Sequence, residues 1–430
     1  MHTVKIALIG FGTIGTGVAK ILLQQQERIA RATGQTVELV KVCDKDTQSD
    51  RGISLPKGVL TAELDDILND DRISVAIELI GGLEPARSIV LSLLKSGKDV
   101  VTANKALLAT HGAEIFDAAR TYGRSVAFEA AVGGGIPVIN AISTALQANE
   151  LRQIQAIVNG TCNFILTTME ENGTNYKNAV TEAQKLGYAE ADPTMDVDGT
   201  DTAQKLAILS QLAFGVCPKW QEIPRTGIDT VDAIDIVYAK QLGYRIKLLA
   251  VADASGDGVE LYVSPMLVRR HTPVAGVRDS FNLIKVVGDA VGECVLIGRG
   301  AGEMPTASAV VGDVIDTVLG RAKTTFDALK LWSADRPAKS IKNSDDIFGK
   351  NYLRFRVEDR PGVLAEISGI LGQHGISIAS VLQREAESEG APVTLIIMTH
   401  AAREGDTLAA IKKIDSLSCT SGKTLRMRVE

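Results

Sequence analysis

The segment Gly10-Phe11-Gly12-Thr13-Ile14-Gly15 constrains the fold of this 430-residue chain more than any other feature. It follows the apolar stretch Val4–Ile9, which predicts a strand, and it opens a stretch that predicts a helix from about Thr13 to Ala30. A G-x-G-x-x-G segment between a strand and a helix is the fingerprint of dinucleotide binding. The first glycine permits the tight turn. The second lets a pyrophosphate approach the helix N-terminus, and the third lets helix and strand pack closely.

The end of the next predicted strand bears on which dinucleotide is bound. Val37–Val42 predicts that strand, and Asp44 follows it. A carboxylate at this point binds the hydroxyls of the adenosine ribose and favours NAD. Basic residues follow that could meet the 2′-phosphate of NADP, and they could equally form a solvated loop. They are Lys45, Arg51 and Lys57. NAD and NADP both stay open as the cofactor.

Further strands alternate with helical stretches, which predicts an α/β domain with a doubly wound parallel sheet of the Rossmann type. The strands are expected at Ser74–Ile80, Asp99–Thr102 and Ser125–Glu129. Ligands of such sheets gather at the carboxyl ends of the strands. Two of these ends carry candidate side chains, namely Thr102 and Lys105 at one end, and Glu129 with a glycine-rich segment at the other.

Composition argues against two classes of partner. The net charge is −6 and the acidic and basic residues are interspersed, so no nucleic acid is expected. No apolar run reaches the roughly 20 residues of a spanning helix, so no membrane is expected. The five cysteines are scattered, and the chain begins directly with a strand rather than a signal peptide. We therefore expect a reduced, cytoplasmic setting.

The turn Asn159-Gly160-Thr161 ends a strand and opens a helix within the stretch Ile154–Leu166. Such a turn can present backbone and hydroxyl donors to an anion. It can equally be a plain turn with a helix N-cap. Asn159, Gly160 and Thr161 are therefore candidate ligand contacts.

Carboxylates are concentrated between Gly187 and Lys205. A helix is predicted from Asp201, and Asp201 and Lys205 are then i and i+4 on one helix face. A lysine beside a carboxylate at the wet end of a buried helix face can have a tuned pKa and move protons. The alternative is an ordinary surface ion pair of little energetic weight.

The other acids of this stretch are expected mostly on a loop, around Pro193 and Gly199. A calcium loop beginning at Asp196 is excluded, because its sixth and twelfth positions hold Asp201 and Ala207 where glycine and glutamate are needed. Turn-forming or capping roles are expected for Asp192, Asp196 and Asp198.

Taken together, these segments resemble homoserine dehydrogenase, in the bacterial monofunctional form with a regulatory tail, over essentially all 430 residues. The shared segments are Gly10–Gly15, Glu78–Gly82, Thr102–Lys105, Glu129–Ile136 and Asn159–Asn163. The most specific match is a family signature, which here reads Ala183–Gly187, Asp192-Pro193, Asp196–Asp201 and Lys205. The resemblance implies NAD(P)-dependent interconversion of L-homoserine and L-aspartate 4-semialdehyde in threonine, methionine and isoleucine biosynthesis.

The resemblance also implies roles for single residues. Glu190 binds the substrate through its ammonium group, Asp201 binds and orients the substrate, and Lys205 donates and accepts the proton. Lys105 lies beside the nicotinamide and substrate and assists the proton step. Other positions implied by the family are Gly187 and Gly302 near the cofactor, and a sodium site made by Glu129 with the carbonyls of Val132, Gly134 and Ile136. Cys43 departs from the family pattern, since an arginine often stands there in enzymes that prefer NADP.

Four regions are expected along the chain. Residues 1–136, joined by about 298–334, form the NAD(P)-binding domain, and 137–297 form an α+β catalytic and dimerisation domain. Residues 335–350 form a linker and 351–430 a regulatory domain. We expect a homodimer or homotetramer.

The tail predicts a ferredoxin-like βαββαβ order, with strands at Tyr352–Val357, Ile376–Gln383, Pro392–His400 and Thr424–Val429. Its D-R-P-G-V-L turn resembles the ACT domain, a module that binds amino acids. By the family, L-threonine is the expected effector, and the candidate contacts are Asp359, Gly362, Val363 and Leu364. The alternative is a dimerisation module without a ligand.

Two other functions compete with this interpretation. A phosphoglycerate dehydrogenase with an ACT tail would use a histidine–carboxylate pair, whereas no histidine lies in any motif here. A non-catalytic NAD-binding regulator would be expected to lack Lys105, Asp201 or Lys205, and all three are present.

Overall fold

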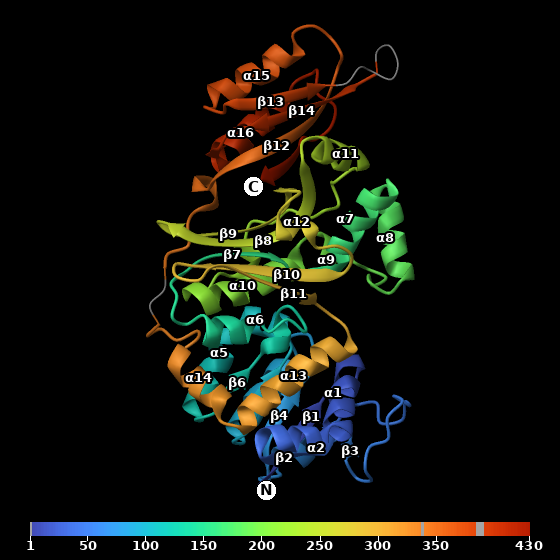
Figure 1. Ribbon diagram of the computed structural model, residues 1–430, viewed down its shortest axis with the longest axis vertical. Helices are drawn as coiled ribbons and strands as arrows, with labels where there is room; N and C mark the ends of the chain where they lie inside the picture. The colour runs from blue at the N-terminus through green and yellow to red at the C-terminus, as the bar shows by residue number, and fades with distance from the viewer. Residues whose placement is uncertain (1, 337–338, 384–390) are drawn as a thin grey trace. The chain divides into compact units, whose positions relative to one another are not determined.

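The computed structural model describes residues 2–336, 339–383 and 391–430 (Figure 1). Positions 337–338 of the expected linker lie outside these residues, as do positions 384–390 between two predicted strands of the tail. The chain forms two compact units. The first contains Met1–Ile154, Ala203–Glu222 and Phe281–Lys339, and the second contains Gln155–Thr202, Ile223–Ser280 and Ser340–Glu430.

The first unit holds a six-stranded parallel sheet in the order β3-β2-β1-β4-β5-β6, as the alternating pattern predicts. The strands are β1 His2–Ile9, β2 Gln35–Cys43, β3 Leu60–Thr61, β4 Ile73–Glu78, β5 Asp99–Thr102 and β6 Val126–Ala127. Consecutive buried residues at the ends of β1 and β4 show that both faces of the sheet are covered. The helices between them are α1 Thr13–Gln24, α2 Gln26–Thr33, α3 Asp65–Leu68, α4 Ala86–Lys95 and α5 Lys105–Thr121.

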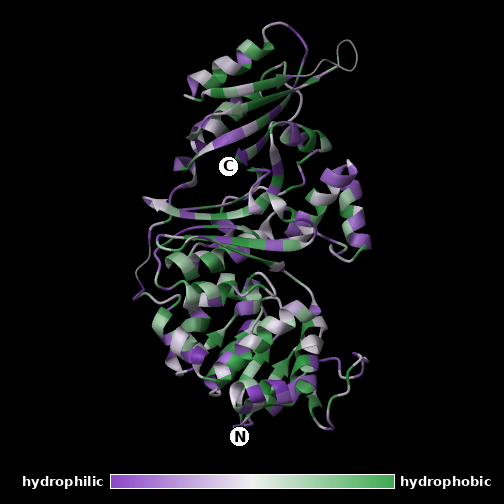
Figure 2. Cartoon of the chain, in the orientation of Figure 1, coloured by the Kyte–Doolittle hydropathy of each residue, from purple (hydrophilic) through white to green (hydrophobic). Residues whose placement is uncertain are grey.

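One face of this sheet is covered by the first helix and by a late segment of the chain. Helix α13 (Glu303–Val318) packs against α1, and Lys20 on α1 forms an ion pair with Glu303 at 2.7 Å. Alternate residues of the strands join these helices in one apolar core, for example Ile6, Leu8 and Val310. Figure 2 shows the hydrophobic residues gathered on the strands and the inner helix faces.

Three short helical turns, a hairpin and a further helix complete the first unit. They are η1 Glu129–Ala131, α6 Val138–Asn140, the π-helix η2 Ala141–Ala145, the antiparallel pair β10 Phe281–Gly288 and β11 Gly292–Arg299, and α14 Arg321–Leu329. The short 3-10 turn η3 spans Trp220–Glu222. Strand β7 (Leu151–Ile157) and helix α10 (Thr200–Phe214) each run across the division between the units.

Several predicted elements of the first unit were wrong in their bounds, and for two of them the structure gives the reason. The single helix predicted from Thr13 to Ala30 breaks at Gln25, whose backbone leaves helical dihedrals so that α2 can direct Ile29 into the same core. The strand predicted to reach Glu129 stops at Ala127. The backbone N–H of Glu129 donates to the Asp313 carboxylate at 2.7 Å instead of continuing the ladder.

The second unit combines helices with a long sheet in the order β7-β8-β9-β16-β12-β14-β13. Its helices are α7 Gly160–Asn172, α8 Tyr176–Lys185, α9 Thr194–Val197, α11 Ala233–Gln241 and α12 Pro273–Gly276. Strands β8 Tyr244–Gly256 and β9 Gly258–Arg269 form an antiparallel hairpin. Strand β9 then pairs in parallel with the last strand, at Met266↔Arg428 and Leu267↔Val429.

The tail has the predicted βαββαβ order. Its elements are β12 Phe348–Val357, α15 Val363–Gln373, β13 Ile378–Gln383, β14 Val393–Thr399, α16 Glu404–Ile414 and β16 Leu425–Val429, with a short turn η4 Ser344–Asp346 and a bridge strand β15 Ala402–Arg403. Both helices share one apolar core with the sheet, through residues such as Phe355, Ile367 and Ile414. Helix α16 has Glu404 and Asp406 in its first turn, where acidic side chains complement the helix dipole.

Candidate active site

The glycine turn after β1 has the geometry that dinucleotide binding requires. Gly10 has φ +96°, and a Cβ there would lie 2.6 Å from the Leu79 carbonyl. A Cβ on Gly15 would lie 2.1 Å from the Gly10 carbonyl oxygen. A Cβ on Gly12 would meet nothing within 4 Å, so this glycine leaves open space beside the N-terminus of α1. The turn therefore fits a pyrophosphate, as the motif predicts.

Asp44, which follows β2, contacts this glycine turn. Its carboxylate accepts hydrogen bonds from the backbone N–H of Phe11 at 2.5 Å and of Asp46 at 2.9 Å. The Arg51 guanidinium lies 3.7 Å from Asp44 and stacks over the Phe11 ring at 5.2 Å. Lys57 is exposed in a turn before β3. A carboxylate and a guanidinium thus both lie beside the glycine turn. The carboxylate is a candidate partner for the ribose hydroxyls, and the guanidinium is one for the 2′-phosphate.

Two buried residues that sequence reasoning did not single out organise the ends of β4 and β5. Glu78 is fully buried, and its carboxylate accepts from Ile80 N–H at 2.8 Å and from the Thr102 hydroxyl at 2.7 Å. Asn104 caps α5 and donates to the Gly82 carbonyl at 2.8 Å. Lys105 is therefore the first residue of a firmly capped helix. The sequence signal that could have identified Glu78 is an acidic residue at the end of an apolar strand, shortly before two glycines.

Glu129 lies in the short turn η1 and is buried. Its two carboxylate oxygens accept from the backbone N–H groups of Ile139 and Asn140, each at 2.8 Å. Burial raises the pKa of Glu129 to about 7. Burial and the charge of Glu129 also raise the pKa of Asp313 well above its usual value. A buried carboxyl group with a second, desolvated carboxyl group close to it favours a bound proton or a bound cation.

The other residues of the expected sodium site lie on the glycine-rich loop after Glu129. Val132 and Ile136 are buried, and Gly134 adopts φ +54°. A Cβ on Gly134 would lie 2.4 Å from the Gly300 carbonyl oxygen, so the loop passes close to the segment that ends at Gly302. Gly302 itself has φ +121° and precedes the first turn of α13. Carbonyl-rich backbone beside a buried carboxylate fits a hard monovalent cation.

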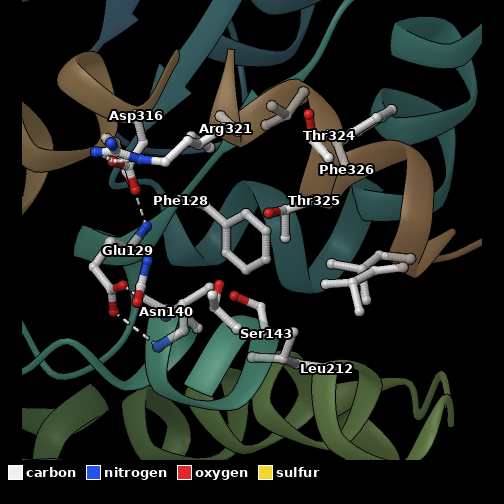
Figure 3. Close-up of a pocket in the computed structure, with 18 of the residues that line it drawn as sticks. Phe128, Glu129, Asn140, Ser143, Leu212, Asp316, Arg321, Thr324, Thr325 and Phe326 are labelled. Carbon is white, nitrogen blue, oxygen red and sulfur yellow. Dashed lines mark hydrogen bonds and ion pairs between the residues drawn. The ribbon is translucent and has the colours of Figure 1, made fainter. Parts of the chain in front are cut away.

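A cavity of about 600 Å³ in the first unit has Glu129 in its lining (Figure 3). Its walls are largely apolar, with Phe128 and Phe326 among them, and Arg321 pairs with Asp316 at its rim. Of the residues proposed from the sequence, this cavity contains only Glu129. We therefore do not assign the chemistry to this cavity, despite its size.

The second unit brings three residues of the predicted substrate region together. Asn159 is the N-cap of α7, and its Oδ1 accepts from Cys162 N–H at 2.8 Å. The amide nitrogen of the same side chain donates to Asp196 at 2.7 Å and to Asp201 at 2.9 Å. Asn159 and Asp201 are only about 5% and 6% exposed. The motif predicted Asn159 and Asp201, but Asp196 was expected only to form a turn or a cap.

The neighbouring positions are arranged as the loop pattern predicts. Asp192 accepts from Thr194 N–H at 3.1 Å and Asp198 from Thr200 N–H at 2.8 Å, which confirms the turn-forming or capping roles predicted for them. The Thr161 hydroxyl donates to the Tyr188 carbonyl at 2.7 Å, next to Gly187, which has φ +76°. Glu190 is exposed on this loop, and its carbonyl accepts from the Gln184 side chain at 3.1 Å. No hydrogen bond found among the described residues joins the Glu190 carboxylate to the Asn159 cluster.

Asp201 and Lys205 both lie on α10, one turn apart, as predicted. Asp201 is buried in the first turn, where the helix dipole favours a carboxylate. Lys205 is partly buried one turn further along. The helix can therefore present a carboxylate and an amine along one face.

The candidate effector residues lie at the start of α15. Gly362 adopts φ +95° and precedes the buried Val363, while Leu364 is 42% exposed. Asp359 accepts a long hydrogen bond of 3.4 Å from the Gln383 side chain. The turn leaves an exposed apolar side chain beside a helix N-terminus.

Three family models match the chain in succession. A model described as the NAD-binding domain of homoserine dehydrogenase matches residues 10–129, one described as homoserine dehydrogenase matches 137–315, and one described as the ACT domain matches 351–419. In the described residues, no helix is both long and apolar enough to cross a bilayer.

Proteins named homoserine dehydrogenase are similar to this chain. Homoserine dehydrogenase of Pseudomonas aeruginosa is 42% identical, covering 100% of this chain and 99% of the relative. The crystal structure of a homoserine dehydrogenase from Thiobacillus denitrificans has a TM-score of 0.90 at 40% identity, covering 100% and 99% of the two chains. A hyperthermophilic archaeal homoserine dehydrogenase in complex with NADPH has a TM-score of 0.63 at 26% identity, covering 74% and 98%. The chain therefore belongs to the homoserine dehydrogenase family, whose members are oxidoreductases.

Proposed function

We propose that this enzyme interconverts L-homoserine and L-aspartate 4-semialdehyde with NAD(P), and that Asn159, Asp201 and Lys205 carry substrate binding and proton transfer. The observation that carries the proposal is the bridge from the Asn159 amide to Asp196 and Asp201, with Lys205 one turn further along α10. A single amide thereby fixes two carboxylates at the start of the helix that also bears the candidate base.

The carboxylates suit the ammonium end of an amino-acid substrate. Each carboxylate oxygen has more than one acceptor site, so Asp201 can hold the Asn159 amide and still accept from a substrate ammonium. Glu190 on the adjacent exposed loop supplies a further carboxylate for the same group. The N-terminal turn of α7, with Gly160 and Thr161, is suited to the substrate carboxylate because helix N-termini attract anions.

The proton step falls to the two lysines. A bound nicotinamide would supply the acceptor for the hydride that leaves the carbinol carbon of homoserine. The substrate hydroxyl loses its proton in the same step, and the Lys205 amine accepts that proton and returns it in the reverse direction. Lys105, at the N-terminus of α5, adds a positive charge that stabilises the developing alkoxide.

The cofactor is a nicotinamide dinucleotide. The open space at Gly12 and the Asp44 carboxylate beside the glycine turn support NAD. Arg51 beside Asp44, and the NADPH complex of the archaeal relative, support acceptance of NADP as well. We propose that both dinucleotides are used, with Asp44 and Arg51 as the opposing determinants.

A sodium ion is proposed at Glu129 with the carbonyls of Val132, Gly134 and Ile136. The support is the buried, hard-to-ionise Glu129 beside Asp313, since a cation at this point offsets two desolvated negative charges. Its role there is to hold the loop that leads from β6 to α6.

Regulation by L-threonine is proposed for the ACT domain, through Asp359, Gly362, Val363 and Leu364. The support is the matched domain and the left-handed turn at Gly362, which leads into the N-terminus of α15. The ACT domain is joined to another helix of the second unit by a direct hydrogen bond. The Tyr352 hydroxyl donates to the buried Asp235 of α11 at 2.9 Å.

A homodimer or homotetramer is proposed, through the region 137–297. The support is β11, which is an edge strand of its sheet and whose residue Ile297 is 55% exposed. An apolar edge strand is a template for pairing with a second copy. A cytoplasmic setting is proposed because all five cysteines are free.

Initial rates test the proposed reaction directly. We expect dinucleotide reduction with L-homoserine and oxidation with aspartate semialdehyde, each with NAD and with NADP. Absence of turnover with L-homoserine and both dinucleotides would overturn the proposal.

A further inference from the structure

Lys247 is one of the most deeply buried residues of the second unit, although it is a lysine. It lies on β8 and is 1% exposed. Its Nζ donates to Asn163 Oδ1 at 2.7 Å and to the Val277 carbonyl at 2.5 Å. Both acceptors are neutral, so the amine is held by dipoles rather than by a counter-ion.

Among the residues that the structure describes, no carboxylate is found hydrogen-bonded to Lys247. Glu170 faces it, but Glu170 pairs with Arg245 at 2.9 Å and with Arg278 at 2.8 Å. Arg245 and Arg278 disfavour a further positive charge, and Asp279 contributes only weakly in the opposite sense. Burial lowers the pKa of Lys247 to about 7. Burying an amine in this way is costly, so packing alone does not account for it.

The acceptor of this amine belongs to the helix that begins at the candidate substrate site. Asn163 lies on α7, four residues after the cap residue Asn159, so the two share one helix face. Asn159 in turn holds Asp196 and Asp201. A continuous set of hydrogen bonds and one helical turn therefore joins Lys247 to the carboxylates.

We propose that Lys247 is a positioning residue for substrate binding: its amine ties the first turn of α7 to β8 and to the loop after α12, and so fixes the orientation of Asn159 against Asp196 and Asp201. The proposal rests on the proposed function, because it assumes that these carboxylates bind the substrate. Lys247 itself is too buried to contact homoserine.

The test uses the full-length enzyme and compares Lys247→Met with Lys98→Met. Lys98 is the matched control, since it is also 1% exposed and donates to a backbone carbonyl, that of Leu68, but lies in the first unit. We expect Lys247→Met to raise the KM for L-homoserine by roughly tenfold to a hundredfold, because small displacements of binding groups have effects of this order. The KM for the dinucleotide should be unchanged, and Lys98→Met should change neither KM.

A double-mutant cycle with Asn163→Leu shows whether Lys247 acts through Asn163. If it does, Lys247→Met/Asn163→Leu has about the same KM for homoserine as either single variant. If the two substitutions instead raise the KM by factors that multiply in the double variant, Lys247 does not act through Asn163. A folded Lys247→Met enzyme with an unchanged KM would overturn the proposal as a whole.

Two further variants distinguish a failure of this proposal from a loss of folding and from a failure of the proposed substrate site. If Lys247→Met is insoluble, Asn163→Ala carries the test, because it removes the same hydrogen bond and keeps the lysine. The Asn159→Ala variant reports on the site itself. Normal homoserine kinetics in Asn159→Ala would reject the site, whereas impaired Asn159→Ala with normal Lys247→Met and Asn163→Ala would reject only the role of Lys247.

Discussion

The side-chain amide of Asn159 donates to the carboxylate of Asp201 at 2.9 Å, although the two residues are 42 positions apart. The same nitrogen reaches Asp196 at 2.7 Å. Asn159 thus caps α7 with its oxygen and aligns two acids with its nitrogen. Since Asp201 opens the helix that bears Lys205, this one side chain links the anion-attracting end of α7 to the candidate base.

Replacement of Asn159 should separate its two roles. Asn159→Asp keeps an oxygen for the Cys162 N–H but places a third carboxylate against Asp196 and Asp201. We expect kcat/KM for homoserine to fall by ~100-fold or more from charge repulsion, with the helix cap retained. Asn159→Ala should additionally lower the free energy of unfolding by about 1 kcal/mol through loss of the cap. Steady-state kinetics and urea denaturation of both variants are the measurements.

Lys205→Ala should lower kcat by orders of magnitude, since general acid–base catalysis contributes roughly 10²- to 10⁴-fold. Binding of the dinucleotide, measured by calorimetry, should survive because Lys205 lies on α10 and not at the glycine turn. Lys105→Ala should cost less if Lys105 only stabilises charge. Normal turnover in Lys205→Ala would remove the assignment of that lysine.

The choice of dinucleotide should respond to Asp44 and Arg51 in opposite directions. Asp44→Ser removes the carboxylate that favours NAD, so the ratio of kcat/KM for NADP to that for NAD should rise by ~10-fold or more. Arg51→Ala should lower the same ratio. Lys57→Ala should lower it further if Lys57, which is exposed in a turn, also meets the 2′-phosphate. Ratios that move together in the Asp44 and Arg51 variants would contradict opposing roles.

The pKa of Glu129 predicts a dependence of stability on pH. Its folded-state value of about 7 exceeds the ordinary value of 4.5, so the folded protein binds more protons between these pH values. Stability from this group is therefore full below about pH 4.5 and is lost as the pH rises through about 7. The Tm of the wild type should fall over this window relative to Glu129→Gln.

Sodium should oppose this loss if it binds at Glu129. At pH 8 the Tm of the wild type should be higher in sodium chloride than in choline chloride of equal ionic strength, and the difference should shrink at pH 5. Glu129→Gln should abolish the difference. An equal response to both salts at pH 8 would argue against the sodium site.

Saturating L-threonine should change the kinetics or the Tm through the tail 352–430. The hydrogen bond from Tyr352 to Asp235 joins the ACT strand β12 to α11, so Tyr352→Phe should weaken the kinetic effect while threonine still binds. Calorimetry measures the binding and initial rates measure the effect. Unchanged rates and melting of the wild-type enzyme at saturating threonine would rule out this regulation.

Local patterns were sufficient for much of the fold. The glycine turn, the α/β alternation and the βαββαβ tail could be predicted because each depends on neighbours within a few residues, through turn geometry and side-chain periodicity. The break of the first helix at Gln25 could not, because it depends on where Ile29 finds a core. The early end of β6 likewise depends on Asp313, which is 184 residues from Glu129.

By itself, the sequence determined the dinucleotide turn, the family and the i, i+4 pairing of Asp201 with Lys205. Only the tertiary structure decided which polar groups meet. It placed Asp196 on Asn159 rather than in a simple turn, buried Glu78 against Thr102, and brought Lys247 to Asn163 across 84 positions. The physical reason is that a buried polar group must find a partner wherever packing places one, and packing is set by the whole fold rather than by sequence spacing.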